Sequence, residues 1–267
     1  MGRGPAVGRC RTVSGFTMVE LVTVMVILGI LSIGTVRFIG DSSQGFASTI
    51  SRGQLAGDTR FAVERLARDV RNALPNSVRV AGSCLEYVPV SGASRYVTLP
   101  LATPAISFQS VPLDPLPLPA GARVAVYPDA DIYTLGSTGV VSPTVVASAP
   151  GAGNIVTMGF AAAHRFPAAS PAARYFVVTD PVSFCVDGGA LYRYTGYGFF
   201  SVQPAAATLP GGLPGRALVA EQVDSPAPFQ VSGATLSRNA VVEMNFIFAR
   251  AGDQIRIEHA VQVRNVP

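Results

Sequence analysis

The first pattern along the chain is a long apolar run near its N-terminus. From Phe16 to Val36, 21 residues carry one charged side chain, Glu20. A helix of that length rises about 30 Å, which is enough to cross the hydrocarbon core of a bilayer. The pattern therefore predicts a membrane-spanning helix over residues 16–37. A carboxylate in hydrocarbon is costly unless something compensates it, so Glu20 needs a partner.

An amphipathic pattern follows over residues 38–74. It is most regular after Arg60, where Leu66, Val70 and Leu74 share one face of a helix. The charged side chains of residues 65–71 fall largely outside that face and are interpreted as a solvated or head-facing helix surface. Five glycines at positions 34, 40, 45, 53 and 57 each cost about 1 kcal/mol relative to alanine and predict a weak middle of the helix. Pro75 is the expected stop signal.

Residues 75–267, here called the head, change to short strand-like runs broken by proline and glycine. We expect two hairpins, with strands at residues 174–186 and 190–200 and at residues 241–248 and 255–263. Residues 112–121 and 138–154 are interpreted as loops. The predicted fold class is α+β: a long N-terminal helix, with a membrane-spanning half and an amphipathic half, packed on a mainly antiparallel β-sheet head.

Charge is unevenly distributed along the sequence. The formal net charge is +4, and all 20 basic residues are arginines. Arg3, Arg9 and Arg11 precede the apolar run with no acid among them, so the positive-inside rule places the N-terminus in the cytoplasm and the head outside. Without residues 1–15 the chain has 17 arginines and 16 acids. This near-neutral balance makes a nucleic-acid partner an unfavoured interpretation.

The three cysteines are Cys10, Cys84 and Cys185. If the first segment is removed, one pair remains, and in an oxidising compartment a Cys84–Cys185 bridge would close a loop of about 100 residues. The alternative is two independent buried thiols. Two cysteines without a nearby histidine make a poor zinc site.

The usual catalytic motifs are missing from the sequence. It contains no phosphate-binding loop, dinucleotide fingerprint, zinc-protease motif or nucleophile elbow, so we predict no enzymatic activity and no cofactor. His259 is in phase with Ile257 and Val261 on one strand face, which favours a packed histidine over a catalytic base. His164 lies in a loop-like segment, and a ligand role for it is the weaker interpretation.

Two further groups have alternative interpretations. Asp129 and Asp131 lie at alternate positions and are either calcium ligands or part of a solvated turn; two oxygen donors are few for a calcium site. Tyr192, Tyr194 and Tyr197 are either a recognition surface for a sugar or protein or, more simply, partly packed strand residues.

Gly-Phe-Thr-Met-Val-Glu at residues 15–20, followed by the unbroken apolar run, resembles the class III prepilin signal of type IV pilins and type II secretion pseudopilins. A secretory signal peptide would have its small residues after the run, whereas Gly15 precedes it. The resemblance implies that prepilin peptidase cuts between Gly15 and Phe16, so residues 1–15 are a leader, and that the Phe16 amine is methylated. It also implies that Glu20 meets the Phe16 amine of a neighbouring subunit during assembly. The alternative is an uncut membrane anchor.

Segments of the N-terminal helix and of the head look like the MshO-type minor pilins of the mannose-sensitive haemagglutinin pilus, and the likeness covers about half of the chain. They are residues 62–80, 84–90, 164–178 and 181–199. The likeness implies a minor pilin that assembles through its N-terminal helix into, or primes or caps, a type IV pilus. The implied partners are other pilin subunits, the inner-membrane assembly platform and prepilin peptidase. The implied location is the inner membrane, with the head in the periplasm, and then the surface pilus. The alternatives are a type II secretion pseudopilin and a pilus-tip adhesin or DNA-binding subunit.

Overall fold

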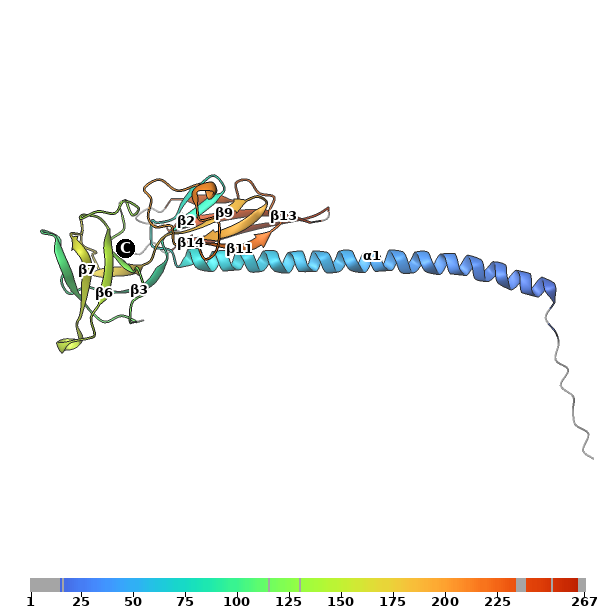
Figure 1. Ribbon diagram of the computed structural model, residues 1–267, viewed down its shortest axis with the longest axis horizontal. Helices are drawn as coiled ribbons and strands as arrows, with labels where there is room; N and C mark the ends of the chain where they lie inside the picture. The colour runs from blue at the N-terminus through green and yellow to red at the C-terminus, as the bar shows by residue number, and fades with distance from the viewer. Residues whose placement is uncertain are drawn as a thin grey trace, which may run out of the picture. The chain divides into compact units, whose positions relative to one another are not determined.

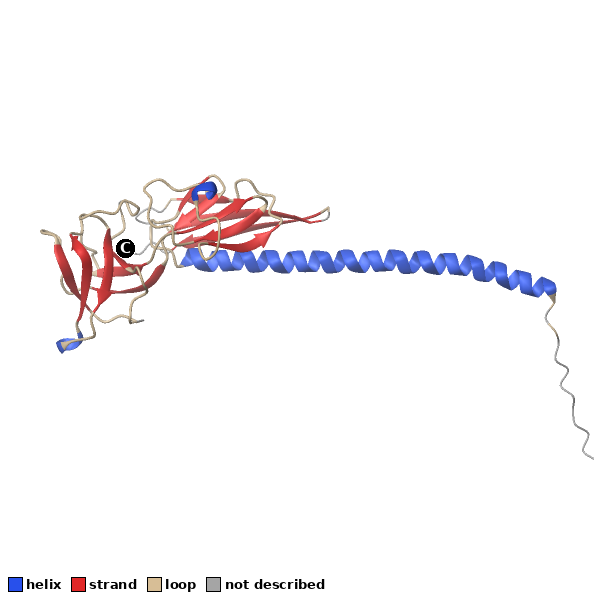
Figure 2. Ribbon diagram, in the orientation of Figure 1, coloured by secondary structure: helices blue, strands red, loops and turns tan. Residues whose placement is uncertain are grey.

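A computed structural model describes residues 15, 17–114, 116–129, 131–233, 239–250 and 252–263 (Figure 1). The chain divides into two compact units, residues 1–53 and 54–267. One long N-terminal helix and antiparallel β-sheets make up the described chain, which confirms the predicted α+β architecture (Figure 2).

The helix α1 spans Met18–Arg71 without a break, so the glycines at positions 34–57 do not interrupt it. It ends three residues before the predicted end at Leu74. The Asn72 and Ala73 amides donate to carbonyls three residues earlier, which tightens the last turn, and the Leu74 amide donates to the Val88 carbonyl at 2.8 Å. Leu74 therefore joins the β-structure, as expected for a residue that precedes proline and is disfavoured in the helical region.

The part of the head that packs on the end of the helix is built from two antiparallel sheets. The five-stranded sheet has the order β1-β2-β9-β10-β11, and the three-stranded sheet has the order β12-β13-β14. Their strands are β1 (Arg79–Ala81), β2 (Cys84–Tyr87), β9 (Val182–Asp187), β10 (Ala190–Tyr194), β11 (Arg216–Glu221), β12 (Phe229–Ser232), β13 (Ala240–Arg250) and β14 (Asp253–Val263). A short 3₁₀ helix, η2 (Ala206–Thr208), lies between β10 and β11.

Both sheets share one hydrophobic core with the helix segment 54–71. Leu55, Val63, Leu66 and Val70 are buried there, against side chains of the two sheets such as Phe246. The spacing of these four residues is that of one helix face, which confirms the amphipathic pattern. We call the helix segment and these two sheets the base.

Between β2 and β9 the chain makes a second, separate body of six strands. The strands are β3 (Val90–Arg95), β4 (Ala105–Ser110), β5 (Arg123–Ala125), β6 (Val141–Ala147), β7 (Val156–His164) and β8 (Arg174–Val178), with a 3₁₀ turn η1 (Ala152–Asn154). Their order is β3-β8-β5-β6-β7-β4. A bridge between Tyr96 and Ser110 pairs the chain just after β3 with the end of β4, and the Val111 amide donates to the Arg95 carbonyl. The sheet thus closes on itself, and we call it the inserted barrel.

The inserted barrel has its own core, which includes Phe108, Val124, Met158, Phe166 and Tyr175. Sequence periodicity did not predict this second core. A smaller cluster joins the barrel to the end of the helix and to the start of the base, and it contains Leu74, Val88, Tyr133 and Phe176. The barrel is therefore fixed to the base by apolar packing as well as by the chain itself.

The strand expectations are partly confirmed. β13 and β14 form the predicted C-terminal hairpin, with eleven residue pairs in register. β9 and β10 form the other hairpin around Gly188 and Gly189. The single strand expected over 174–186 is wrong, because this stretch forms two strands, β8 in the inserted barrel and β9 in the base. The expected strand over 190–200 ends at Tyr194, because the chain turns away at Gly196 and Gly198, which have φ values of 71° and 80°.

The loop expected over 138–154 is wrong, since β6 occupies Val141–Ala147. Three valines in that stretch favour an extended conformation, and the proline among them does not prevent pairing with β5 and β7. The described part of 112–121 contains no strand, as expected.

Candidate functional site

The helix begins immediately after the predicted processing site. Gly15 is exposed, and Phe16 lies outside the described residues. Thr17 precedes the helix and caps it: its Oγ1 accepts a hydrogen bond from the Glu20 amide at 3.3 Å. Thr17 and Glu20 have the spacing of a capping box, a local signal that marks the start of the helix more sharply than the apolar run does.

Glu20 lies in the first turn of α1 and is exposed. Its carboxylate has no side-chain partner among the described residues. The hydroxyl groups of Thr23, Ser32 and Thr35 behave differently, because each donates to the carbonyl four residues earlier, at 3.0, 2.7 and 2.8 Å. Such internal bonds make hydroxyl groups tolerable in an apolar segment. A carboxylate has no proton to donate, so Glu20 needs a donor from elsewhere.

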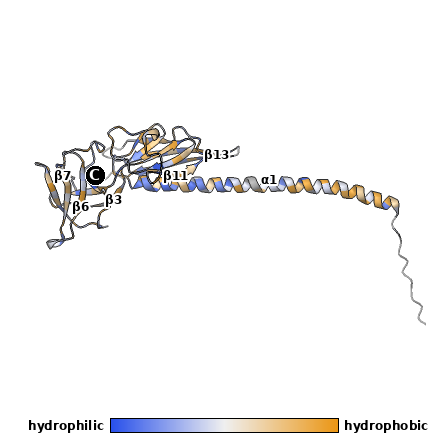
Figure 3. Cartoon of the chain, viewed as in Figure 1, coloured by the Kyte–Doolittle hydropathy of each residue, from blue (hydrophilic) through white to orange (hydrophobic). Residues whose placement is uncertain are grey.

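The apolar side chains of the first unit have no partner within the described chain. Large hydrophobic residues from Met18 to Phe46 are exposed, and α1 is long and apolar enough to cross a membrane. Figure 3 shows this segment as the hydrophobic part of α1, with hydrophilic residues prevailing nearer Arg71. A surface of this kind requires lipid or other apolar helices around it.

The predicted disulfide is present. Cys84 on β2 and Cys185 on β9 are bonded and are direct register partners, with 101 residues of sequence separation. Both sulfurs belong to buried residues. The chain leaves for the inserted barrel just after β2 and returns from it just before β9, so the bond joins the two strands between which the barrel is inserted.

A buried polar network lies where the base meets the inserted barrel. Glu86 is fully buried on β2, and one of its carboxylate oxygens accepts from Arg79 Nε at 2.5 Å. The other oxygen accepts a hydrogen bond from the Tyr197 hydroxyl at 3.0 Å. The Tyr197 hydroxyl also lies 2.8 Å from Ser183 Oγ. Burial, followed by the nearby negative charge of Glu86, raises the pKa of Tyr197, so its hydroxyl remains a donor.

Arg79 extends this network to the barrel. Its guanidinium lies 3.5 Å from the ring centroid of Tyr133 and donates to the carbonyls of Phe200 and Ser201 at 2.7 Å. The Tyr133 hydroxyl in turn donates to the Ser77 carbonyl. We call Arg79, Glu86, Tyr133 and Tyr197 the junction network. It holds three parts of the chain together: the base, the barrel and the loop after β10.

Glu86→Gln is expected to lower the free energy of unfolding by about 2–3 kcal/mol. The substitution removes the charge opposite Arg79, and a hydrogen bond to a charged group contributes about 1.5–3 kcal/mol. Urea unfolding of the detergent-solubilised chain measures the change. Glu258→Gln is the matched control, because Glu258 pairs with Arg256 on an exposed surface at 2.9 Å and should cost under about 1 kcal/mol. Equal effects of the two changes would show that the junction network contributes little.

The tyrosines mainly pack against the protein. Tyr194 is buried in a cluster with both cysteines and Leu209, and Tyr197 belongs to the junction network. Tyr192 is half-buried beneath Arg216, whose guanidinium lies 3.6 Å from its ring centroid and is paired with Asp187 at 3.0 Å. These contacts support the packed interpretation.

His164 lies at the end of β7 and is fully buried, so the loop-like interpretation of its surroundings is wrong. Its ring nitrogens lie 3.1 and 3.0 Å from the carbonyl oxygens of Gly136 and Gly139. Burial lowers the pKa of His164 against the opposing effect of those two carbonyls. His259 is half-buried on the predicted face of β14, opposite Met244, which is the packed placement expected for it.

The low pKa of His164 makes stability depend on pH. As pH falls below about 6.5, the unfolded chain binds a proton at this residue before the folded chain does, so the free energy of unfolding falls. One group contributes at most about 1.4 kcal/mol per pH unit. We expect unfolding measured from pH 7.5 to 5 to show this loss and His164→Gln to remove it, with His259→Gln as control. A histidine proton resonance that titrates above its ordinary pKa would contradict the prediction.

Asp131 is used as a turn residue. Its Oδ1 accepts from the amides of Tyr133 and Thr134 at 3.0 and 3.3 Å. Hydrogen bonds lower the pKa of Asp131, and the bond from the Thr134 side chain has the largest effect. Among the residues that the structure describes, no group of three or more acids, histidines or cysteines is close enough together to hold a metal ion. The geometry around Asp129 and Asp131 thus favours the turn interpretation.

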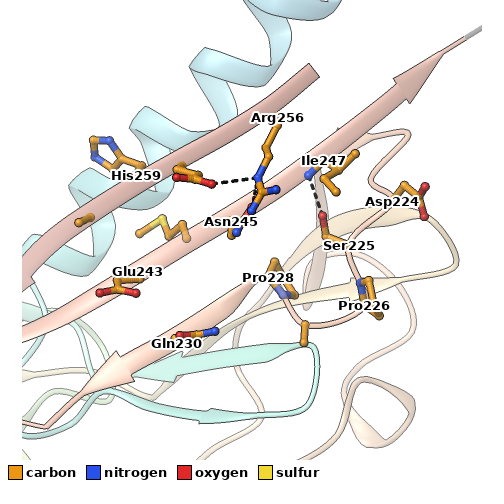
Figure 4. Close-up of a pocket in the computed structure, with 14 residues that line it drawn as sticks. Asp224, Ser225, Pro226, Pro228, Gln230, Glu243, Asn245, Ile247, Arg256 and His259 are labelled. Atoms are coloured by element: carbon orange, nitrogen blue, oxygen red, sulfur yellow. Dashed lines mark hydrogen bonds and ion pairs between the residues drawn. The ribbon is translucent and has the colours of Figure 1, made fainter. Parts of the chain in front are cut away.

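A cavity of about 600 Å³ lies on the outer face of the β13–β14 hairpin, with residues 224–228 along its rim (Figure 4). Some of its polar groups bind one another. Arg256 donates to Asn245 at 3.2 Å and pairs with Glu258, and Ser225 Oγ accepts from the Ile247 amide at 2.7 Å. These contacts pair part of the polar lining, whereas the buried Nε2 of His259, which also lines the cavity, has no hydrogen-bond partner among the described residues.

The comparison with protein families gives one match. Residues 10–36 match the model of the prokaryotic N-terminal methylation motif. The motif indicates a type IV pilin-like or pseudopilin subunit. The matched range contains Gly15, Thr17 and Glu20 and the exposed apolar part of α1 up to residue 36. Searches among curated proteins and among solved structures found no match.

For a pilin-like subunit, the motif and the apolar helix indicate partners and a mode of anchoring. The motif implies association with other pilin subunits and with the prepilin peptidase, and the apolar helix is consistent with membrane anchoring.

Proposed function

We propose that the chain is a minor pilin that assembles through its N-terminal helix into, or primes or caps, a type IV pilus of the mannose-sensitive haemagglutinin type. The observation that carries this proposal is Glu20, an acid without a side-chain partner in the described chain, in the part of α1 whose large apolar side chains from Met18 to Phe46 are exposed. The methylation motif over residues 10–36 supports the pilin pathway. The likeness of residues 62–80, 84–90, 164–178 and 181–199 to MshO-type minor pilins supports the finer assignment.

Assembly proceeds in two steps. Prepilin peptidase, acting at the inner membrane, cuts between Gly15 and Phe16 and leaves a methylated, cationic amine at Phe16. Glu20 lies four residues further on, about 6 Å along a helix axis. The amine of one subunit pairs with Glu20 of its neighbour in a low-dielectric environment, where an unpaired charge is costly. The assembly platform brings the subunits together, with their heads in the periplasm, and the fibre then extends to the cell surface.

The proposed role is structural. The subunit has no enzymatic activity and needs no cofactor, because helix packing and the amine–carboxylate contact supply the free energy of assembly. Nucleic acid is not a partner in this scheme.

Mass spectrometry of the mature N-terminus tests the pathway. We expect the protein recovered from cell membranes to begin at methylated Phe16, and immunogold labelling to find it on sheared pili at low abundance. A protein that keeps residues 1–15 would overturn the assignment.

A type II secretion pseudopilin is the second candidate, since the methylation motif fits both classes. Deletion of the gene distinguishes them. Loss of surface pili with normal protein secretion supports the minor pilin, whereas loss of secretion with normal pili supports the pseudopilin.

The inserted barrel favours a third candidate, a pilus-tip adhesin. It is a separate body with its own core, placed between two strands of the base, and such a body can present a binding surface without disturbing the base. If the barrel serves adhesion, removing residues 90–178 should abolish attachment of piliated cells and leave the pilus intact.

A further inference from the structure

The last strand of the base, β14, has a free edge. It pairs with β13 on one side, and no strand of the described chain pairs with its other side. Its eleven residues stay in register with β13 without a bulge, and the strand contains no proline. Proteins commonly blunt an edge with a bulge or a proline, because an intact edge is a template for pairing with another chain. β14 is therefore an intact template.

The register shows which backbone groups β14 directs to this edge. On β13, the amides of Asn245 and Ala249 donate to carbonyls of the chain between β11 and β12 at 2.8 and 3.0 Å. Consecutive residues of an antiparallel strand direct these groups to opposite sides, so Phe246 bonds its partner on β14, Ile257. The alternate residues of β14 therefore direct their amides and carbonyls to the free edge. They are Gln254, Arg256, Glu258, Ala260 and Gln262.

Two of these five edge residues carry opposite charges. The side chains of Arg256 and Glu258 lie on the outer face of β14, where they pair at 2.9 Å and are 60% and 68% exposed. Two β14 strands can pair antiparallel with Ile257 of one copy opposite Ile257 of the other. In that register Arg256 of each copy lies opposite Glu258 of the other, with Cβ atoms about 5 Å apart, and opposite charges at this spacing stabilise a strand pair.

The same charges disfavour the neighbouring registers. Only the alternate residues direct backbone groups to the edge, so the pairing can shift only in steps that keep edge residue opposite edge residue. One such shift places Arg256 opposite Arg256 of the other copy, and the opposite shift places Glu258 opposite Glu258. Like charges directly opposite are destabilising. Hydrogen bonding and charge therefore select the same single register.

We propose that the free edge of β14 binds β14 of a second copy of this chain, antiparallel and in this register, so that the sheet continues across a two-fold axis. Ile255 and Ile257 belong to the core face but are only partly buried, and the added strand covers them. A two-fold contact closes as a dimer, whereas a fibre repeats a head-to-tail contact. The edge thus joins two subunits that are not consecutive in one fibre, and it adds self-recognition of the head to the proposed assembly role.

Charge reversal tests the proposal on the full chain in nonionic detergent by sedimentation equilibrium. We expect the wild type to dimerise with a Kd on the order of 10 μM. Arg256→Glu and Glu258→Arg each place like charges opposite each other twice, so each should weaken the dimer at least about tenfold. The double variant carrying both changes should restore it, and an equimolar mixture of the two single variants should form a mixed dimer. Glu64→Arg, at an exposed position on α1, should leave dimerisation unchanged.

Cysteine cross-linking reports the register. Ile257 lies on the two-fold axis in a non-hydrogen-bonded pair, whose Cα atoms lie about 4.5 Å apart, a distance that a disulfide can bridge. In a Cys10→Ala background the remaining cysteines are bonded to each other. There, Ile257→Cys should give a disulfide-linked dimer on a non-reducing gel. Ile255→Cys is the matched control and should not, because it lies opposite His259 of the other copy, four residues from its own counterpart.

Two results would overturn the proposal: a chain that stays monomeric up to about 100 μM, or dimers that both single charge reversals leave unchanged. Dimers joined through the apolar part of α1 would give the second result. Cross-linking of Ile255→Cys as strong as that of Ile257→Cys would overturn the register. Arg256→Glu subunits should still be processed at Phe16 and enter the pilus, so the proposal can fail while the minor pilin assignment stands.

Discussion

Glu20→Ala is expected to leave processing intact and to remove the subunit from the pilus. The cleavage site lies before the helix, whereas Glu20 contributes its carboxylate to a contact with the next subunit. Losing one partner of a buried ion pair costs about 3–5 kcal/mol, which weakens each subunit contact about a hundredfold or more. The measurement is the ratio of subunit in sheared pili to subunit in membranes, by immunoblot, together with the mass of the mature N-terminus.

The matched control for Glu20→Ala is Glu64→Ala. Glu64 is an exposed acid on the same helix, within the unit of residues 54–267. It should change incorporation far less, because a solvated carboxylate contributes little to a contact. If Glu20→Ala subunits enter the pilus at the wild-type level, the amine–carboxylate pairing is not what drives assembly. If the mutant chain also keeps its leader, Glu20 acts in recognition by the peptidase instead.

The sequence predicts the elements whose signal is local. The run from Phe16 to Val36 has one charge and no break, and helix length and hydropathy are properties of a single segment. The β13–β14 hairpin was also predicted, because its two strand-like runs follow each other directly along the chain. The disulfide was predicted by counting, since one pair of cysteines remains once the leader is removed.

The inserted barrel was not predicted because its strands pair with partners far along the chain. β3 pairs with β8 across about 80 residues, and β5 has three residues. The loop predicted over 138–154 is an example: its valines lie between prolines and glycines, and only pairing with β5 and β7 makes an ordered strand there. His164 was misplaced for the same reason, since its burial depends on carbonyls 28 and 25 residues earlier.

The junction network combines a pair of residues that is local in the sequence with residues from distant segments. Arg79 and Glu86 face each other across the β1–β2 hairpin on either side of Gly82, so the opposite-charge pair is local in the sequence, although it was not predicted. Their burial was not readable, because Tyr133 and Tyr197 come from the barrel and from the loop after β10. A local pair thus becomes a buried network only when distant segments cover it.

Breaking the disulfide should have the largest effect on the stability of the head. Replacing both Cys84 and Cys185 by alanine is expected to lower the free energy of unfolding by about 4–5 kcal/mol, the value that the chain-entropy model gives for a closed loop of about 100 residues. The reason is that the unfolded chain regains the freedom of the whole segment that makes the barrel. Urea unfolding of the detergent-solubilised chain measures the change.

Two controls separate this effect from lost packing. Reduction of the wild-type protein removes the bond and keeps both sulfur atoms, so it should reproduce most of the loss. Cys10→Ala should have no effect, because that residue belongs to the predicted leader. Hydrogen exchange should quicken first in β2 and β9, the strands that the bond joins. Unchanged stability after reduction would mean that the junction network and the apolar cluster around Leu74 and Phe176 already hold the barrel on the base.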